Sequence, residues 1–155
     1  MVTERLKGHE LFGLLSPKEV ERLSGASGVI RLKEGERVYS EGMPASHLFV
    51  LLKGRVELTR PAKGAASFLV DDLMEGSLLG VSSLTGIERY LLNAECMEDS
   101  ELVKIEARVL RRILDENPVV GYAIQRRVSE IFFRRHVAAM ESLQAITQTA
   151  LAGAT

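Results

Sequence analysis

The hydrophobic residues change their spacing twice along the chain, and each change predicts a different kind of element. Near the N-terminus, Ser16 can cap a helix, Pro17 suits its first turn, and Glu19 completes a capping box. Gly25 or Gly28 would end this helix. A short N-terminal helix is therefore expected before the spacing changes.

Between residues 28 and 105, short runs of Val, Leu, Ile and Phe are separated by glycines. Many short strands at such intervals are typical of an all-β barrel or sandwich. The clearest pair of strands covers residues 48–52 and 55–59, and the second of them alternates apolar and polar positions. Lys53-Gly54 lies between the two, so we expect a tight hairpin with the glycine at a positive φ.

After residue 105 the helical spacing returns. A helix of about ten residues carries one apolar stripe, and Asn117-Pro118 breaks it. A second helix runs from Pro118 to about Thr147 and spans roughly 40 Å. A helix of that length projects beyond a small barrel, so we expect it to pair with a second copy in coiled-coil fashion. The chain thus divides into a barrel domain at 1–117, a long dimerisation helix at 118–148 and a frayed tail at 149–155.

Composition narrows the function classes. The 155 residues suffice for one domain with its own core, and the net charge of −1 argues against a dedicated nucleic-acid binder. The single cysteine, Cys96, excludes an internal disulfide, and the three histidines show no metal-ligand spacing, so no metal cofactor is expected. No apolar run approaches the ~20 residues of a membrane span, and the N-terminus lacks a signal-peptide core, so we expect a cytoplasmic protein. No set of acid–base or nucleophilic residues converges in the sequence, so no enzyme activity is expected.

The segment from Glu75 to Ile105 contains the candidate site. A glycine turn and a short apolar strand at 76–81 lead into a loop with Ser82 and Ser83, and an alternating strand follows at 90–96. A loop of backbone N–H groups and hydroxyls between two buried strands can hold a small anion.

Strict alternation in the strand at 90–96 predicts which side chains face inward. The inner face would carry Tyr90, Leu92, Ala94 and Cys96. The outer face would carry Arg89, Leu91, Asn93 and Glu95. A local bulge would exchange the positions of Arg89 and Tyr90.

The order of the elements, with the strings HLFVLLKGRVELT and MEDSELVKIEARVLRRILDENP, resembles the cyclic nucleotide-binding domain of the catabolite activator/FNR (CRP-FNR) family of regulators. The resemblance covers about Leu11 to Ile146. The turn glycines fall where that fold needs them: Gly35, Gly42, Gly54, Gly76 and Gly80. The resemblance implies a mainly β fold with flanking helices: a double-stranded β-helix or jelly-roll-like barrel, short N-terminal helices and a long C-terminal dimerisation helix.

In that family the phosphate-binding cassette reads approximately Phe-Gly-Glu, a small-residue turn, then Arg-Ser/Thr-Ala. The Glu bonds the ribose 2′-hydroxyl, and the Arg bonds the cyclic phosphate. This chain has Leu79-Gly80-Val81 in the first part, so Val81 replaces the Glu. When the chain is aligned with the family pattern at the turn that follows this strand, the Arg position falls on Tyr90, followed by Leu91. When it is aligned by residue identity, the Arg position falls on Arg89. Loss of a hydrogen bond to the phosphate lowers the affinity by roughly 10- to 100-fold, so we expect weakened binding of cAMP or cGMP. A different small effector is therefore an alternative ligand.

The cassette backbone and the hydroxyls of Ser82 and Ser83 remain as ligand contacts, and Arg135 and His136 are expected near the nucleotide base. The resemblance therefore implies a homodimeric sensor or regulatory module that binds a small-molecule effector and signals through its C-terminal helix. One alternative is a protein-interaction module whose pocket is filled by its own side chains. The other is the effector half of a transcription regulator that lacks its helix-turn-helix domain. No DNA-binding element is expected in the chain, and a protein partner is a further option.

Overall fold

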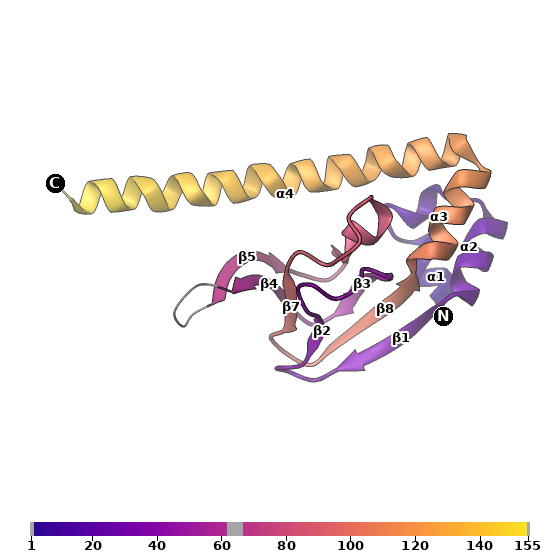
Figure 1. Cartoon of the computed structure of the whole chain (residues 1–155), viewed down its shortest axis with the longest axis horizontal. Helices are drawn as coiled ribbons and strands as arrows, with labels where there is room; N and C mark the ends of the chain where they lie inside the picture. The colour runs from indigo at the N-terminus through magenta and orange to yellow at the C-terminus, as the bar shows by residue number, and fades with distance from the viewer. Residues whose placement is uncertain (1, 62–66, 155) are drawn as a thin grey trace.

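The structure, a computed structural model, describes residues 2–61 and 67–154. Within these residues, eight strands form a roll that is flanked by helices and crossed by one long helix (Figure 1). The helical elements are α1 (Val2–Lys7), the 3-10 turn η1 (Phe12–Leu14), α2 (Pro17–Gly25), the 3-10 turn η2 (Val81–Leu84), α3 (Ala107–Glu116) and α4 (Pro118–Gly153). The strands are β1 (Ser27–Leu32), β2 (Arg37–Tyr39), β3 (His47–Lys53), β4 (Val56–Pro61), β5 (Ser67–Leu73), β6 (Leu78–Leu79), β7 (Asn93–Cys96) and β8 (Ser100–Glu106).

The strands form two four-stranded antiparallel sheets, in the orders β1-β8-β3-β6 and β2-β7-β4-β5. Strands from the two ends of the roll pair with each other, since β1 pairs with β8 and β2 pairs with β7. Such nested pairing is that of a jelly roll. The expected mainly β fold with flanking helices is confirmed.

The hairpin predicted at residues 48–59 is wrong. β3 and β4 belong to different sheets, because β3 pairs with β8 and β4 pairs with β7. Gly54 has the expected positive φ, at 104°, but it turns the chain from one sheet into the other. The backbone there runs against the turn between β7 and β8, since a Cβ at Gly54 would lie 2.2 Å from the Oγ of Ser100. The alternation of apolar and polar residues identified the two strands. Their pairing instead depends on β7 and β8, which come much later in the chain.

The strand expected at 76–81 is shorter than predicted. Only Leu78 and Leu79 pair with β3, as β6. Gly80 then adopts a left-handed conformation with φ 72° and ψ 27°, and η2 begins at Val81. The left-handed glycine ends the strand because it turns the backbone out of the extended conformation.

The strand expected at 90–96 is also too long, since β7 begins only at Asn93. Before it, Arg89 forms an isolated bridge with Pro44. Asn93, predicted to face outward, is instead buried, with 5% of its surface exposed. Its Oδ1 accepts a hydrogen bond of 2.8 Å from the backbone N–H of Glu41, so the segment after β2 lies against this side chain.

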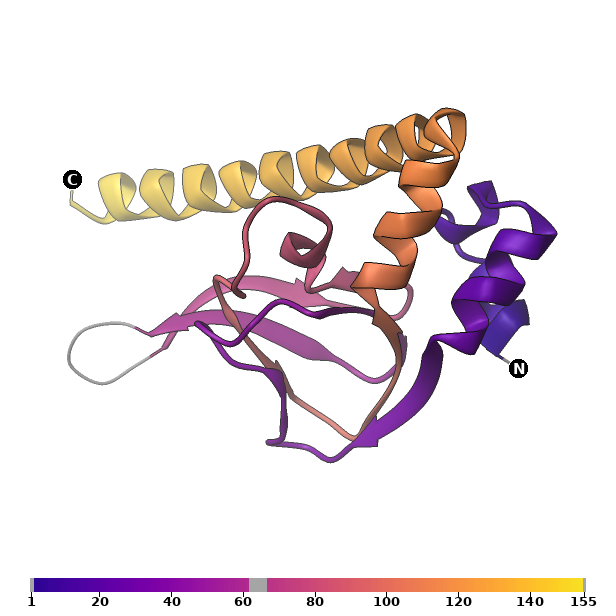
Figure 2. The same ribbon diagram turned by 45° about the vertical axis from the view of Figure 1, so that its right-hand side comes forward.

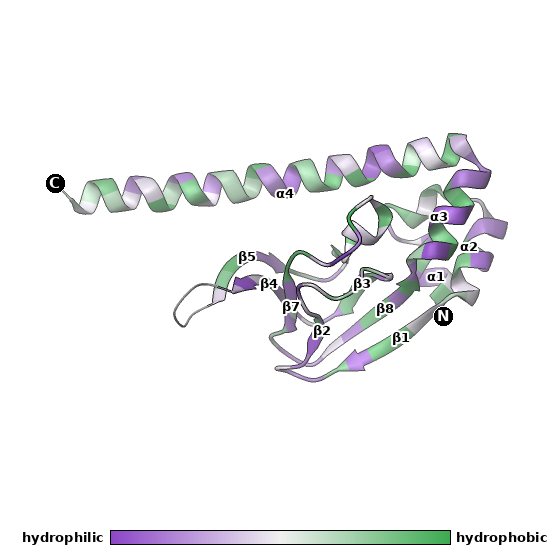
Figure 3. Ribbon diagram, viewed as in Figure 1, coloured by the Kyte–Doolittle hydropathy of each residue, from purple (hydrophilic) through white to green (hydrophobic). Residues whose placement is uncertain are grey.

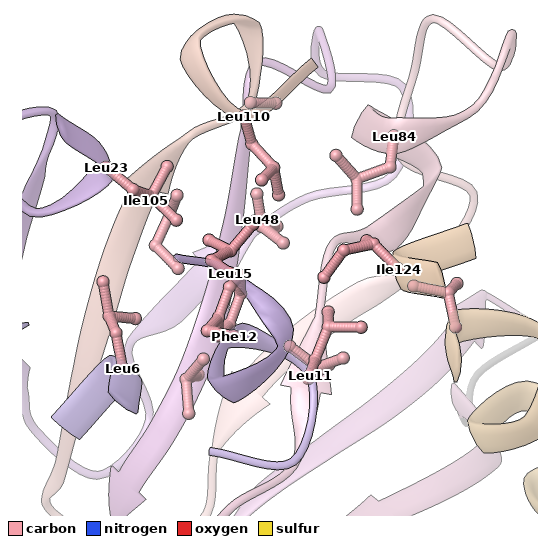
Figure 4. Packing of buried hydrophobic residues seen from close by; sticks show 14 of the residues in the cluster. Leu6, Leu11, Phe12, Leu15, Leu23, Leu48, Leu84, Ile105, Leu110 and Ile124 are labelled. Carbon is pink, nitrogen blue, oxygen red and sulfur yellow. The ribbon is translucent and has the colours of Figure 1, made fainter. Parts of the chain in front are cut away.

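The helices at the N-terminus pack on the sheet that contains β3 and β8. α2 begins with the predicted capping box: the Oγ of Ser16 accepts from the N–H of Glu19, and the Glu19 carboxylate accepts from the N–H of Ser16. The larger hydrophobic cluster joins these helices to the sheet and to α3 and α4 (Figure 4). Its fully buried members include Leu6, Leu11, Phe12, Leu23, Leu48, Ile105, Leu110 and Ile124.

α3 and α4 meet at the corner that Asn117-Pro118 predicted. The Oδ1 of Asn117 accepts from the N–H of Val120 and so caps α4. The two helices approach closely at Gly121, where a Cβ would lie 2.7 Å from the Leu114 carbonyl oxygen. Because of this corner, α4 turns back and runs along the roll.

The first half of α4 lies against the roll, and its C-terminal turns project past the strands (Figure 1). Its buried residues are Gly121, Ile124, Val128 and Ile131. Every described residue from His136 to Ala154 is exposed. The helix continues to Gly153, so the tail expected to fray from 149 is helical up to that residue. No helix in residues 2–61 and 67–154 is both long and apolar enough to cross a membrane.

Candidate functional site

A cavity of about 450 Å³ lies between the roll and the first half of α4. Its volume is within the range of about 300–1,000 Å³ that is usual for small-molecule sites. We call it the α4 cavity. It is lined by Tyr39, Leu58, Leu79, Gly80, Val81, Ser82, Thr85, Ile87, Tyr90, Leu91, Leu92, Gln125, Val128, Ser129, Phe132 and Arg135.

The segment between β6 and β7 forms the wall of the cavity that faces α4. In Figures 1 and 2 this segment, which contains η2, rises from the roll toward α4. Gly80 is required at its start, because a Cβ there would lie 2.9 Å from the His47 carbonyl oxygen and 3.1 Å from the Tyr90 ring. The left-handed glycine therefore lets the segment pass close to β3 and to a tyrosine.

Two stacked tyrosines line the cavity on the side of the roll. The ring centroids of Tyr39 and Tyr90 are 4.0 Å apart, with an interplanar angle of 18°. The Tyr39 hydroxyl accepts a hydrogen bond of 3.2 Å from the N–H of Gly80, and burial raises the pKa of this hydroxyl well above its ordinary value. The Tyr90 hydroxyl donates to the carbonyl of His47 at 2.6 Å and accepts from its N–H at 3.2 Å. Both hydroxyls are thus used to hold the wall together.

The structure decides which of two neighbouring residues faces the cavity. Tyr90 lines it and is 4% exposed, as the alternation predicted. Arg89 lies outside, where its guanidinium donates a hydrogen bond of 2.6 Å to the Gly42 carbonyl. The residue that faces the cavity is therefore Tyr90, whose hydroxyl is already bonded to backbone.

A cation reaches the cavity from α4 instead. Arg135 is the one charged side chain among the described lining residues, and 19% of its side chain is exposed. Its Nη2 donates to the Leu78 carbonyl at 2.7 Å, and its guanidinium carbon lies 4.8 Å from the centroid of the Phe132 ring. Its Nε lies 4.0 Å from a carboxylate oxygen of Asp71. Burial lowers the pKa of Arg135, and the Asp71 carboxylate opposes that shift; the guanidinium nevertheless stays charged.

The other residues predicted as ligand contacts divide between the cavity and its surroundings. Leu79, Gly80, Val81, Ser82 and Leu91 line the α4 cavity, together with Tyr90 and Arg135.

Besides Arg89, two predicted contacts lie outside the cavity. Ser83 is buried, with its Oγ donating to the Gly80 carbonyl at 2.7 Å and its own carbonyl accepting from Arg111, so it holds η2 in place. His136 is exposed on the far part of α4, where its ring lies 6.4 Å from that of Phe133. The helical spacing predicted the right turn of α4 but not the side of the helix that faces the roll.

Sequence reasoning missed several lining residues. Gln125, Val128, Ser129 and Phe132 lie on the same face of α4 as Arg135, at steps of three and four residues. Working back from Arg135 along the helical period would have found them. Tyr39 has no such local signal, because its place in the cavity depends on the pairing of β2 with β7.

Comparison with known proteins agrees with this geometry. The family model of the cyclic nucleotide-binding domain matches residues 29–117. The chain belongs to the cyclic nucleotide-binding domain family. The matched residues include both sheets and α3, and they end where α4 begins.

Individual relatives are similar over most of this chain. An anaerobic regulatory protein of Bacillus subtilis is 23% identical over 117 residues, which are 75% of this chain and 49% of that protein. The chain thus spans about half the length of this curated relative. Among solved structures, the sensor domain of the transcriptional regulator DNR from Pseudomonas aeruginosa has a TM-score of 0.76 at 22% identity, and the match covers 86% of this chain and 89% of that one. The regulatory domain of Toxoplasma gondii PKA with cAMP has a TM-score of 0.70 at 16% identity, covering 84% of this chain and 49% of that one. The resemblance found in the sequence motifs is confirmed.

Proposed function

We propose that this cyclic nucleotide-binding domain is a regulatory sensor, in which a small effector occupies the α4 cavity and changes the position of α4. The effector is a cyclic nucleotide or another small anion. The observation that carries the proposal is the cavity itself, which is open and has Arg135 of α4 at its wall. The sensor domain and the cAMP-bound regulatory domain among the similar structures support the same kind of role.

The way in which α4 is attached supports a signal through that helix. A ligand in the cavity touches the roll through Leu79 and Val81 and touches α4 through Arg135 and Phe132. Such a ligand binds best to one position of α4 relative to the roll, and so it shifts the population toward that position. The part of α4 after Arg135 is exposed on all sides, so a small change near Arg135 would be carried to the far end of a continuous helix.

The open cavity argues against the alternative in which the module's own side chains fill the pocket. Leu91 replaces a small polar residue of the family's cassette, yet 53% of its surface is exposed at the cavity. Leu79 and Val81 are buried without closing the space. A protein-interaction module without a ligand would gain by collapsing this volume, because empty apolar space forfeits packing contacts.

We also propose that the far half of α4 pairs with a second copy of the chain. Phe133, Val137 and Met140 follow one another at steps of four and three residues and are 69%, 41% and 54% exposed. Figure 3 shows hydrophobic positions continuing along this projecting part of the helix. Apolar residues at this spacing on an isolated helix are those that pair in a coiled coil. Light scattering behind a sizing column tests the pairing: the chain should elute as a dimer, and Met140→Glu should convert it to a monomer.

A thermal-shift screen tests the sensor function. The purified chain is heated with cAMP, cGMP, cyclic dinucleotides and small organic anions, beside an Arg135→Ala variant. A ligand at 100 times its Kd stabilises the folded state by about 2.7 kcal/mol, which is several degrees for a domain of this size. The shift should be lost in Arg135→Ala.

Arg126 provides the matched control, since it lies on α4, does not line the cavity and pairs with Glu130 at 3.4 Å. Arg126→Ala should keep the ligand-induced shift. If no probe stabilises the chain, or if both arginine variants respond like the wild type, the cavity is not the sensor site.

A further inference from the structure

We propose that the effector of the α4 cavity is an apolar monoanion, such as an aromatic or branched aliphatic carboxylate, whose charged group pairs with Arg135. This inference rests on the proposed sensor function and names the class of ligand. It follows from the charge, the polarity and the exposed rim of the cavity.

The charge of the cavity favours a single negative group. Arg135 is its one cation among the described lining residues, and Asp71 lies 4.0 Å from the guanidinium Nε. The Nη2 of Arg135 is used by the Leu78 carbonyl, but a guanidinium carries five N–H donors, so others remain for a carboxylate. A ligand with two negative charges would bring the second charge near Asp71 with no cation to meet it. One carboxylate therefore matches the site better than a dianion does.

The walls of the cavity favour a hydrocarbon body. Most of the lining is aliphatic or aromatic. The Tyr90 hydroxyl both donates to and accepts from the backbone of His47, and the Tyr39 hydroxyl accepts from the N–H of Gly80. The hydroxyls of Thr85 and Ser129, which also line the cavity, donate to backbone carbonyls. At the position of the family's ribose-binding Glu stands Val81, which is 7% exposed and offers no hydrogen bond. A ligand rich in hydroxyls would leave polar groups unpaired against this wall, which costs affinity. A flat apolar group would instead contact the tyrosine and phenylalanine rings.

The rim of the cavity carries large apolar side chains in water. Ile87, Leu91 and Phe132 all line the cavity and are 45%, 53% and 38% exposed. They come from both sides of the opening, the first two from the segment after η2 and the third from α4. An apolar ligand would cover all three, and this burial would add to its affinity.

A pair of probes separates the charge from the hydrocarbon. Naphthalene-2-acetate and naphthalene-2-acetamide have the same ring and nearly the same size, and they differ in the negative charge. Titration calorimetry of the full chain should show the carboxylate binding at least tenfold more tightly than the amide, because a hydrogen bond to a charged group has about this effect. In Arg135→Gln the two affinities should become equal, whereas Arg126→Gln should keep the difference.

Two further variants test the inference without relying on Arg135. Ser129 is exposed on α4 and lines the cavity, so Ser129→Phe should block the ring of either probe without disturbing the core. Asp71 is not among the lining residues, and Asp71→Asn should strengthen carboxylate binding about two- to fivefold by removing a nearby negative charge.

The outcomes separate the inference from the function on which it rests. Equal affinity for the two naphthalene probes would overturn the inference, and so would carboxylate binding that survives Ser129→Phe. Binding of cAMP in an Arg135-dependent manner, with no binding of naphthalene-2-acetate, would also overturn it but would leave the sensor function standing. If the carboxylate does not bind and no probe of the thermal-shift screen binds either, both the inference and the sensor function fail.

Discussion

Substitution of Gly80 by alanine should destabilise the domain more than the same substitution at Gly76. Gly80 has a φ of 72°, and a left-handed conformation costs a residue with a Cβ about 1–2 kcal/mol. The new Cβ would also lie 2.9 Å from the His47 carbonyl oxygen and 3.1 Å from the Tyr90 ring. Neither can move freely, because the Tyr90 hydroxyl is bonded to the same His47 carbonyl. This overpacking costs a further amount of about 1–3 kcal/mol, so we expect the free energy of unfolding to fall by about 2–5 kcal/mol in total.

Gly76 separates the two contributions. Its φ is 89°, yet a Cβ there would meet no atom within 4 Å, so Gly76→Ala should lose only about 1–2 kcal/mol. Urea unfolding followed by circular dichroism, at one protein concentration for all variants, measures both free energies. If Gly80→Ala loses no more free energy of unfolding than Gly76→Ala, the close approach of Gly80 to β3 does not affect stability, and the argument that this position requires glycine is refuted.

Three other residues give predictions that standard measurements can check. Asn93→Ala should lower the free energy of unfolding by about 0.5–1.5 kcal/mol, because the hydrogen bond between its buried side chain and the N–H of Glu41 is lost, and an unchanged urea midpoint would contradict this. Cys96 is 1% exposed and burial raises the pKa of its thiol, so it should react with a thiol reagent only on unfolding; rapid labelling of the native chain would be the contrary result. Burial lowers the pKa of His9, whose Nδ1 accepts from the Leu11 N–H, so the unfolded state binds the extra proton more readily. Stability should therefore fall as the pH drops below about 6.5, and this dependence should be smaller in His9→Gln when unfolding is measured across pH.

Several elements could be predicted because their determinants are local. The capping box of Ser16 and Glu19 and the break at Asn117-Pro118 involve residues that are neighbours in the sequence. All five turn glycines named from the sequence have positive φ: Gly35, Gly42, Gly54, Gly76 and Gly80. The division of the chain into a barrel domain and a separate long helix stays a prediction.

The errors concern interactions between distant segments. The pairing of β3 with β8, and not with β4, is set by strands that lie far apart in the sequence. Alternation did not predict the burial of Asn93, because that burial comes with a hydrogen bond to Glu41, which is 52 residues earlier in the chain.

The candidate site shows the same division between local and distant signals. Tyr90 was placed inward correctly because alternation is local, and the prediction of Arg135 combined the family resemblance with a count along one helix. His136 was included wrongly among the residues near the cavity, because the count did not establish which side of α4 meets the roll. Tyr39 could not be found from neighbouring residues, since its place in the cavity depends on the pairing of β2 with β7.

The central claim is that a small effector enters the space between the cassette and α4. Methyl NMR of the chain labelled at Leu and Val tests it most directly, with cAMP and naphthalene-2-acetate added in turn. The account predicts that at least one of these probes shifts the methyl signals of Leu91, Leu92 and Val128, which line the cavity. The signals of Leu143 and Leu151, exposed on the far half of α4, should not shift by direct contact and should respond less. Unchanged cavity signals with both probes, or shifts confined to the far half of α4, would contradict the claim.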